Sequence, residues 1–202
     1  MKQTLHAILT GDIVSSRKAD VTTWLPVLQE SLAYYSNNFD IFRGDSFQIS
    51  LPIERCMEAL FYIKAKMRSI QPLDVRMGLG IGEIEYQDLH IKNSTGQALI
   101  YSGEAFDRLD KELIYLKTPW ADFDELANIM LQLSMELAGR WTLNMSQTIA
   151  AIISNPEANQ HDIAQLLGRK YQSQISNEIN NANWPKIKLT IDYCTSQLKK
   201  RC

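Results

Sequence analysis

Residues 8–20, ILTGDIVSSRKAD, contain the end of an apolar run followed by one carboxylate, two serines and two cations. Residues 5–10 predict a buried strand that stops at Gly11 and Asp12. A simple loop does not require this order of acid, hydroxyl and positive charge. We therefore treat Asp12 as a candidate metal ligand. The candidate phosphate site consists of the backbone N–H groups after it, at Ile13, Val14, Ser15 and Ser16.

A second acid lies in FRGDSFQIS, residues 42–50. Extended runs at 39–42 and 47–51 flank the turn that contains Asp45, so this stretch predicts a β-hairpin with Asp45 at its tip. A strand that ends at Asp12 beside this hairpin would bring both acids to one edge of a sheet. Mg²⁺ is usually held by a few carboxylates, completed by phosphate and water. The plainer alternative is that both acids are ordinary turn or N-cap residues.

The remaining pattern up to residue 118 alternates strands and helices. Helical spacing predicts helices at 21–37, 52–70 and 96–109. Extended patterns predict strands at 75–81 and 113–116, with a short pair of extended runs at 84–86 and 89–91. The order is roughly βαββαβ with additions, which favours an α+β sandwich with helices on one face. Three glycines inside a strand predict close backbone approach: Gly78, Gly80 and Gly82.

The whole chain has the composition of a globular protein, with 202 residues, 45% hydrophobic and 22% charged. No apolar run approaches the ~20 residues of a membrane span, so we expect no membrane association. The N-terminal stretch MKQTLHAILTGD has no signal-peptide pattern. The whole chain has 3 cysteines, an odd number, and they lie far apart in the sequence, which suits a reducing cytoplasm. These features predict a cytoplasmic protein.

Charge divides the chain into two parts. Residues 1–139 carry a formal net charge of −6 and residues 140–202 carry +4, which together give −2. Residues 122–139 have the apolar spacing of a long amphipathic helix. We therefore predict an α+β domain at 1–120, a connecting helix at 121–140 and a helical domain at 141–202. The basic balance of the last part suggests nucleic acid as a partner.

Residues 160–184, QHDIAQLLGRKYQSQISNEINNANW, have helix-turn-helix spacing. Ala164 permits a close helix crossing, Gly168 permits a sharp turn, and Ile175 faces inward from a second helix at about 171–183. Polar and basic side chains on the outer side are candidate DNA contacts: Arg169, Lys170, Gln172, Ser173, Gln174 and Asn177. The alternative is a helical hairpin that only packs on the first domain or on a partner.

Several motifs resemble known families. GDIVSSR, FRGDSFQIS and VRMGLGIGEI, in this order, resemble the first half of a class III nucleotide cyclase domain over roughly residues 5–118. TGDIVSSR, RGDSFQ, MGLGIGEI and SGEAFDRLD resemble the SatD family of bacterial proteins along the chain. The cyclase resemblance implies a ferredoxin-like, nucleotide-cyclase-like sandwich, with Asp12 and Asp45 at the two metal-binding aspartates. It also implies Mg²⁺ as cofactor, a nucleotide ligand and a homodimer.

The sequence departs from the cyclase pattern where the purine is read and where the transition state is stabilised. Ile41 occupies the position of the purine-reading lysine, and Glu104 falls near that of the transition-state arginine. Preorganised positive charge is a large part of phosphoryl-transfer catalysis, so a glutamate there opposes it. The alignment contains gaps, which leaves Arg108 or Lys111 open as replacements. We assign no catalytic residue.

Two hypotheses of different class follow. The first is a DNA-binding transcriptional regulator whose degenerate cyclase-like domain senses a nucleotide, binds Mg²⁺ or dimerises. The second is a Mg²⁺-dependent nucleotide cyclase, or a related phosphoryl-transfer enzyme, with an accessory helical domain. Ile41 and Glu104 count against the enzyme, while Arg169 and Lys170 beside a polar helix favour the regulator. We favour the regulator.

Overall fold

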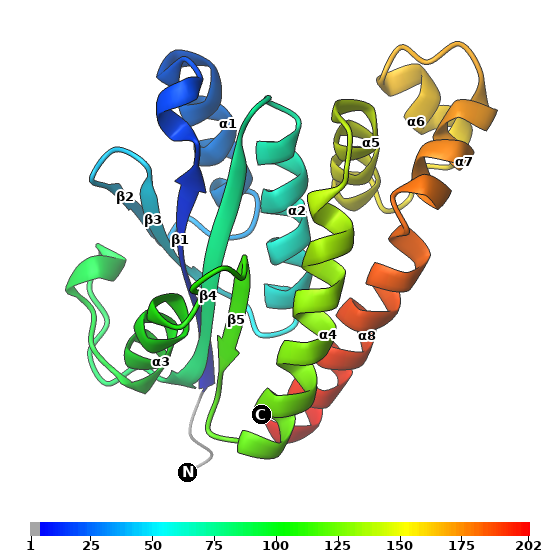
Figure 1. Ribbon diagram of the computed structural model, residues 1–202. Coiled ribbons are helices and arrows are strands. Elements are labelled where there is room, and N and C mark those ends of the chain that lie inside the picture. The colour runs from blue at the N-terminus through cyan, green and yellow to red at the C-terminus, as the bar shows by residue number, and fades with distance from the viewer. Residues whose placement is uncertain (1–4) are drawn as a thin grey trace.

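A five-stranded mixed sheet forms the centre of the computed structural model (Figure 1). The structure describes residues 5–202. Residues 1–4, which begin the predicted first domain and the stretch without a signal-peptide pattern, lie outside the described residues. Along the sheet the strands have the order β2-β3-β1-β4-β5. Their bounds are β1 Leu5–Val14, β2 Phe39–Phe42, β3 Ser46–Leu51, β4 Asp74–Glu83 and β5 Ile114–Lys117.

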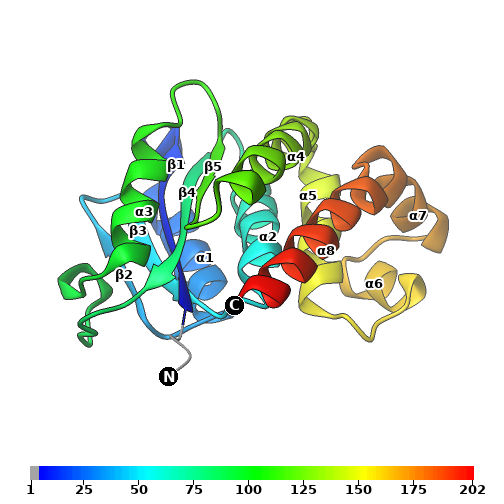
Figure 2. The same cartoon turned by 90° about the horizontal axis from the view of Figure 1, so that it is seen from below.

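The central strand β1 is antiparallel to both of its neighbours, β3 and β4, while β5 lies parallel to β4. The connection β1-α1-β2 crosses over β3, and the connection β3-α2-β4 crosses over β1. The helices of both connections lie on the same face of the sheet (Figure 2). These helices are α1 Val21–Ala33, which begins where Asp20 accepts a hydrogen bond from the Thr22 N–H, and α2 Cys56–Arg68. The element order confirms the α+β class.

Helix α3, Gln97–Asp107, packs on the opposite face of the sheet, against β4 and β1. The glycines of β4 allow this contact, because a Cβ on Gly80 would lie 2.2 Å from the Ser102 nitrogen and one on Gly78 2.3 Å from the Phe106 nitrogen. The predicted close approach is thus confirmed. The expectation of helices on one face is wrong, because the glycine stripe lets a helix backbone lie directly on the second face.

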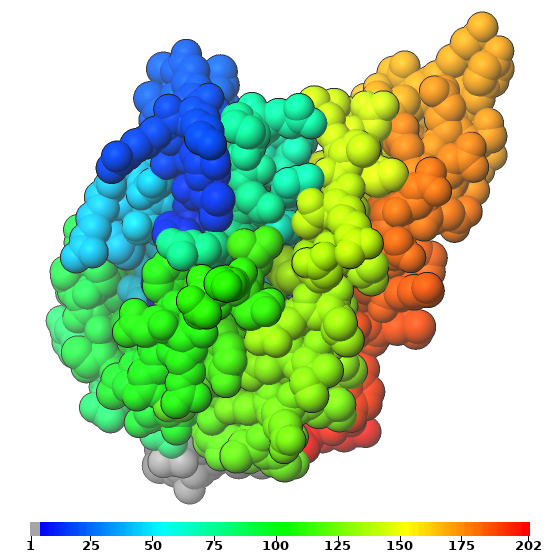
Figure 3. Space-filling model, in the orientation of Figure 1, coloured from blue at the N-terminus to red at the C-terminus, as the bar shows by residue number. Residues whose placement is uncertain are grey.

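Five further helices complete the described chain: α4 Ala121–Gly139, α5 Leu143–Ser154, α6 Gln160–Leu166, α7 Gln172–Asn181 and α8 Trp184–Arg201. Helix α4 lies along the sheet edge, where the Asn128 side chain donates to the Leu116 carbonyl and accepts from the Leu116 N–H, at 2.9 and 2.7 Å. Helix α8 runs beside α4 and also contacts α2. Helix α5 packs against α2, and the orange segment with α6 and α7 projects beyond it (Figure 3).

One continuous cluster of buried apolar side chains extends from the sheet through α2 and α4 to α5 and α8. It therefore extends across the predicted connecting helix at residues 121–140, and the division into domains stays a prediction. Lys64 is fully buried, and its Nζ donates to Asp74 at 2.5 Å. Arg68 contacts the same carboxylate and also donates to the Trp141 carbonyl at 2.7 Å. These bonds join the sheet to the start of the helical part.

Two local predictions differ from the structure. Strand β1 extends to Val14, because its ladder with β4 continues to the pair Val14–Asp74. Residues 84–91 do not form the predicted pair of extended runs, and contain instead part of an isolated bridge, Tyr86–Thr95, and the start of a 3₁₀ turn, Ile91–Asn93. Asp88 favours this loop, because its carboxylate accepts from the His90 N–H and its own N–H donates to Ser94.

No helix in residues 5–202 is both long enough and apolar enough to span a lipid bilayer.

Candidate functional site

Asp12 lies near the end of the central strand, in the ladder between its two neighbours. It is opposite Ser46 on β3 and opposite Arg76 on β4. Asp45 directly precedes Ser46, at the tip of the β2–β3 hairpin. The structure therefore places the two predicted acids at the same end of adjacent strands.

Both carboxylate oxygens of Asp12 accept hydrogen bonds from Arg76. The Arg76 Nε donates to Oδ1 at 3.0 Å, and one terminal nitrogen donates to Oδ2 at 2.5 Å. This hydrogen bonding raises the pKa of Arg76, so the guanidinium remains charged. The guanidinium also lies 5.7 Å from the ring centroid of Phe106 on α3. Asp12 is therefore half of an ion pair that the sequence did not predict.

Asp45 is held by the residues that follow Asp12. Its backbone carbonyl accepts from the Ile13 N–H at 3.0 Å, and its Oδ2 accepts from the Ser16 hydroxyl at 2.6 Å. The turn before it contains positive φ angles at Arg43, 54°, and Gly44, 94°. The hairpin tip is thus fixed to the β1–α1 connection by one backbone and one side-chain hydrogen bond.

The predicted phosphate site is only partly available. Ile13 is buried and its N–H is already used by Asp45, whereas Val14, Ser15 and Ser16 are half-buried. Ser15 has a φ of 64°, and a short 3₁₀ turn, Ser16–Lys18, follows it. A hollow of about 510 Å³ opens here, lined by residues 12–18 with Asp45, Arg76 and Leu113. Its charged groups are Asp12, Asp45, Arg17, Lys18 and Arg76, so cations exceed carboxylates.

The donor set does not fit Mg²⁺ in this arrangement. Arg76 holds both oxygens of Asp12, and Ser16 donates to one oxygen of Asp45. In the described part of the chain, no group of three or more His, Cys, Asp or Glu side chains is arranged to hold a metal ion. A guanidinium on the first aspartate would also repel a cation there. Beyond the Asp12–Arg76 pair, the hollow has the cations Arg17 and Lys18 and the carboxylate of Asp45.

Neither the residues that depart from the cyclase pattern, nor the two cations named as replacements, line this hollow. Ile41 is half-buried on β2. Glu104 on α3 forms an ion pair with Lys117 on β5. Arg108 ends α3 and lies 5.9 Å from the ring centroid of Tyr115, and Lys111 is exposed beyond it.

The second candidate region is the helix pair α6–α7. Helix α6 ends before Gly168, whose φ is 64°, and the Arg169 N–H donates to the Ala164 carbonyl at 2.8 Å. This is the hydrogen bond of a Schellman motif, which lets the chain turn sharply after a helix. A small apolar cluster fills the space between α5, α6 and α7: Ala151, Ile163, Ala164 and Ile175.

Most predicted DNA contacts are exposed, but Arg169 is not. The exposed ones are Lys170, Gln172, Ser173, Gln174 and Asn177. The Arg169 Nε donates to Glu178 of α7 at 3.2 Å, and a terminal nitrogen donates to the Gln147 side chain of α5 at 3.2 Å. The Thr148 hydroxyl also donates to Glu178. Arg169 therefore ties the turn to α5 and α7.

Two partners were missed in the sequence, Arg76 and Glu178. Arg76 stands two residues before the first glycine of the stripe, and only the β1–β4 register shows that it faces Asp12. Glu178 is the single charged residue within α7, Gln172–Asn181. A single acid in an otherwise uncharged helix that follows a basic turn could have indicated an ion pair between that acid and a cation of the turn.

Comparison with known proteins gives a weak structural likeness and no match in sequence. Neither a protein family nor a curated protein matches the chain. Among solved structures, the chain is similar to a bacterial light-regulated adenylyl cyclase, with 15% identity and a TM-score of 0.40 over 58% of this chain and 44% of that one. The chain thus spans less than half the length of that cyclase. The SatD resemblance rests on the sequence motifs alone.

Proposed function

We propose that the chain is a DNA-binding transcriptional regulator whose α+β part is a degenerate nucleotide-cyclase-like module that senses a nucleotide or dimerises. The observation that carries this proposal is the exposed polar face of α7, which follows the Gly168 turn in the basic part of the chain. Recognition helices read base edges with such side chains, while cations beside them contact phosphates.

The packing of α5–α7 supports a helix-turn-helix unit. Ala164 and Ile175 are buried where α6 and α7 meet, and α5 contacts both helices. Lys170 lies exposed just before α7, with its Nζ 5.1 Å from the ring centroid of Tyr171. In this proposal, Lys170 contacts the DNA backbone, and Gln172, Ser173, Gln174 and Asn177 face the bases. Arg169 acts as the internal tie of the unit.

The topology of the α+β part supports the cyclase-like proposal. The order β1-α1-β2-β3-α2-β4, with strands arranged β2-β3-β1-β4, is that of ferredoxin-like folds. The hollow at the end of β1 offers Arg17, Lys18 and Arg76. We propose that these cations bind the phosphates of a nucleotide, and that Arg76 supplies the positive charge that a metal ion would otherwise bring.

The alternative function is a Mg²⁺-dependent nucleotide cyclase or a related phosphoryl-transfer enzyme. The observation in its favour is that Asp12 and Asp45 lie at the same end of adjacent strands. The Asp12–Arg76 ion pair and the Glu104–Lys117 pair count against it, because they engage one aspartate and place a carboxylate on α3. We therefore keep it as the second candidate.

The DNA proposal is tested by selecting bound fragments from a genomic library and then measuring affinity at several salt concentrations. We expect one sequence to be enriched. Lys170→Gln should reduce the slope of log K against log salt by about 1, because one phosphate contact is lost. Asn177→Ala should cost about 1–3 kcal/mol on the selected site and little on random DNA.

The matched control is Lys111→Gln, which removes an exposed cation on the loop after α3. It should leave the salt slope unchanged. Arg169 is not used as a test residue, because its substitution would loosen the turn rather than remove one phosphate contact. If no sequence is enriched and Lys170→Gln leaves the slope unchanged, the regulator proposal fails and α5–α7 is better described as a packing module.

We also propose that the protein forms a homodimer. Three large apolar side chains are exposed on one side of α4: Leu126, Ile129 and Leu133. Such a stripe is typical of a surface that a partner covers. Leu133→Glu should convert the dimer to a single chain in light scattering, whereas Leu189→Glu on α8 should not. A wild-type mass of one 23.1 kDa chain at micromolar concentration would contradict the proposal.

A further inference from the structure

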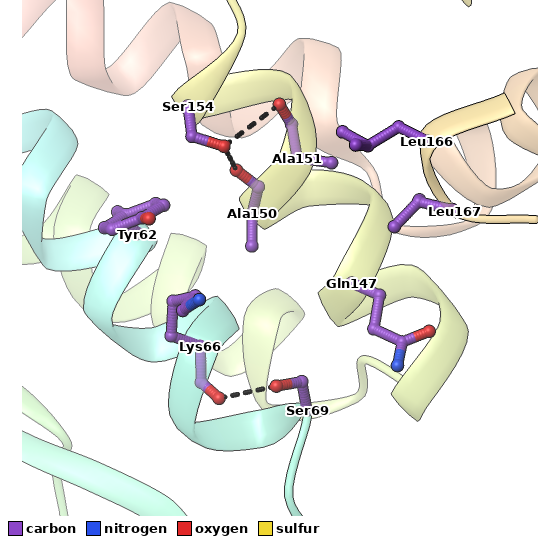
Figure 4. Close-up of a pocket in the computed structure, with 9 residues that line it drawn as sticks. All are labelled: Tyr62, Lys66, Ser69, Gln147, Ala150, Ala151, Ser154, Leu166 and Leu167. Atoms are coloured by element: carbon purple, nitrogen blue, oxygen red, sulfur yellow. Dashed lines mark hydrogen bonds between the residues drawn. The ribbon is translucent and has the colours of Figure 1, made fainter. Parts of the chain in front are cut away.

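A second hollow lies where the α+β part meets helices α5 and α6, far along the chain from Asp12 and Asp45. Its volume is about 470 Å³, within the range of small-molecule sites. Figure 4 shows the side chains that line it. Helix α2 contributes Tyr62 and Lys66, with Ser69 just after it; α5 contributes Gln147, Ala150, Ala151 and Ser154; and Leu166 and Leu167 come from the end of α6.

The α2 side of this hollow is positively charged. Lys66 is half-buried, and the ion pairs found within residues 5–202 do not include it. Tyr62 lines the same side, whereas the Ser69 hydroxyl already donates to the Lys66 backbone carbonyl at 2.6 Å. The Tyr62 phenol is neutral at neutral pH and can donate a hydrogen bond, and burial raises its pKa further. A cation with a neighbouring hydroxyl donor is suited to an anionic group.

The opposite side is mainly apolar between the polar side chains of Gln147 and Ser154, which are already bonded to Arg169 and to α5 carbonyls. Ala150 and Ala151 present only methyl groups, and both are more than nine-tenths buried. Leu166 is 61% exposed at the end of α6, and Leu167 lies next to it. An apolar chain on these residues would cover the leucine that the protein alone leaves in solvent. The site is therefore amphipathic, with charge at α2 and apolar surface at α6.

We propose that this hollow binds a small molecule with one anionic group and a short apolar chain, with the anion on Lys66 and the chain on Ala150, Ala151 and Leu166. Leu166 and Leu167 immediately precede the Gly168 turn. Gln147, which also lines the hollow, accepts the hydrogen bond from Arg169 of that turn. The occupant thus contacts Leu166 and Leu167 directly before the turn and Gln147, which bonds to Arg169 just after it, so its binding restrains that connection.

The binding proposal is independent of any role in DNA recognition. A consequence of binding, that the ligand changes the affinity of the protein for DNA, rests on the proposed function. Binding of octanoate to the full chain therefore tests the site directly, by calorimetry and by backbone hydrogen exchange. We expect saturable binding of octanoate and slower exchange at residues 163–169. Octanamide, which lacks the charge, and acetate, which lacks the chain, should each bind at least tenfold more weakly.

Two variants locate the site. Lys66→Gln should weaken octanoate binding about tenfold and leave octanamide unaffected, whereas Lys111→Gln should change neither. Leu166→Ser should weaken octanoate about threefold to tenfold, whereas Leu189→Ser, an exposed leucine on α8, should not. All four positions are at least partly exposed, so the variants are expected to fold.

The proposal is overturned if octanoate and octanamide bind alike, or if Lys66→Gln binds octanoate as the wild type does. Failure of the proposed function has a different result, in which octanoate binds with the expected dependence on Lys66 but no DNA sequence is selected. In that case the ligand site stands and the DNA-binding proposal does not.

Discussion

An arginine–carboxylate pair lies in each of the two candidate regions, but the surroundings of the two pairs differ. Arg76 and Asp12, at the end of the sheet, are 39% and 21% exposed and line an open hollow. Arg169 and Glu178, at the α6–α7 turn, are 16% and 14% exposed and also bond to Gln147 and Thr148. The first pair faces open space, while the second joins the turn after α6 to α5 and α7.

The difference shows that one kind of contact can have two uses. An ion pair in solvent contributes little to stability, because water and salt screen it and side-chain entropy opposes it. A pair that is mostly buried and bonded to further groups is costly to break, because the remaining charge is left without a partner. The open pair is therefore suited to exchange, and the closed pair to structure.

The largest expected effect is at the turn. Glu178→Gln removes the charge that balances Arg169 and should lower the free energy of unfolding by about 2–3 kcal/mol. The loss should appear first as faster hydrogen exchange in residues 160–181. Chemical denaturation and exchange measurements check this. Glu157→Gln, an exposed acid before α6, is the control and should be neutral. A loss below about 0.5 kcal/mol would remove the distinction between the two pairs.

A smaller effect is expected at the end of the sheet. Asp12→Asn should lower the free energy of unfolding by about 0.5–1 kcal/mol, since the Arg76 guanidinium can be solvated where it stands. Denaturation with urea measures the change, with Asp110→Asn as a control on an exposed loop. If the loss equals that of Glu178→Gln, the strand-end pair is structural and does not open.

The smallest effect concerns ligand affinity. Asp12→Asn frees Arg76 for a phosphate, so ATP should bind about threefold more tightly in the presence of EDTA. For the wild type, ATP should raise the melting temperature equally with and without Mg²⁺. Thermal denaturation and calorimetry check both statements. If binding requires Mg²⁺ and is lost in Asp12→Asn, then Asp12 is a metal ligand and the enzyme hypothesis gains.

The element order could be predicted because local patterns determine it. The hairpin strands Phe39–Phe42 and Ser46–Leu51 follow from their extended runs and the turn between them. The end of α6 follows from Gly168. The position of α3 on the second face was missed, since a glycine stripe indicates close approach but not which element approaches.

The partners of the candidate residues could not be predicted, because they depend on register and packing between distant segments. Asp12 meets Arg76 only when β1 and β4 pair so that Leu5 faces Glu83. Arg169 turns inward because Glu178 and Gln147 lie on two different helices that meet at the turn. The sequence indicates which residues carry charge, whereas the packing decides whether that charge remains available.

The continuous buried cluster also has a consequence for synthesis on the ribosome. Its α8 members are Trp184, Ile187, Ile191, Cys194 and Leu198, and α8 contacts both α2 and α4. A growing chain in which the sheet has already formed therefore exposes apolar surface on α2 and α4 until residues 184–201 have emerged. Such exposed surface is what chaperones bind. Until α8 has packed against them, the sheet and its helices are therefore more prone to aggregate than the finished fold.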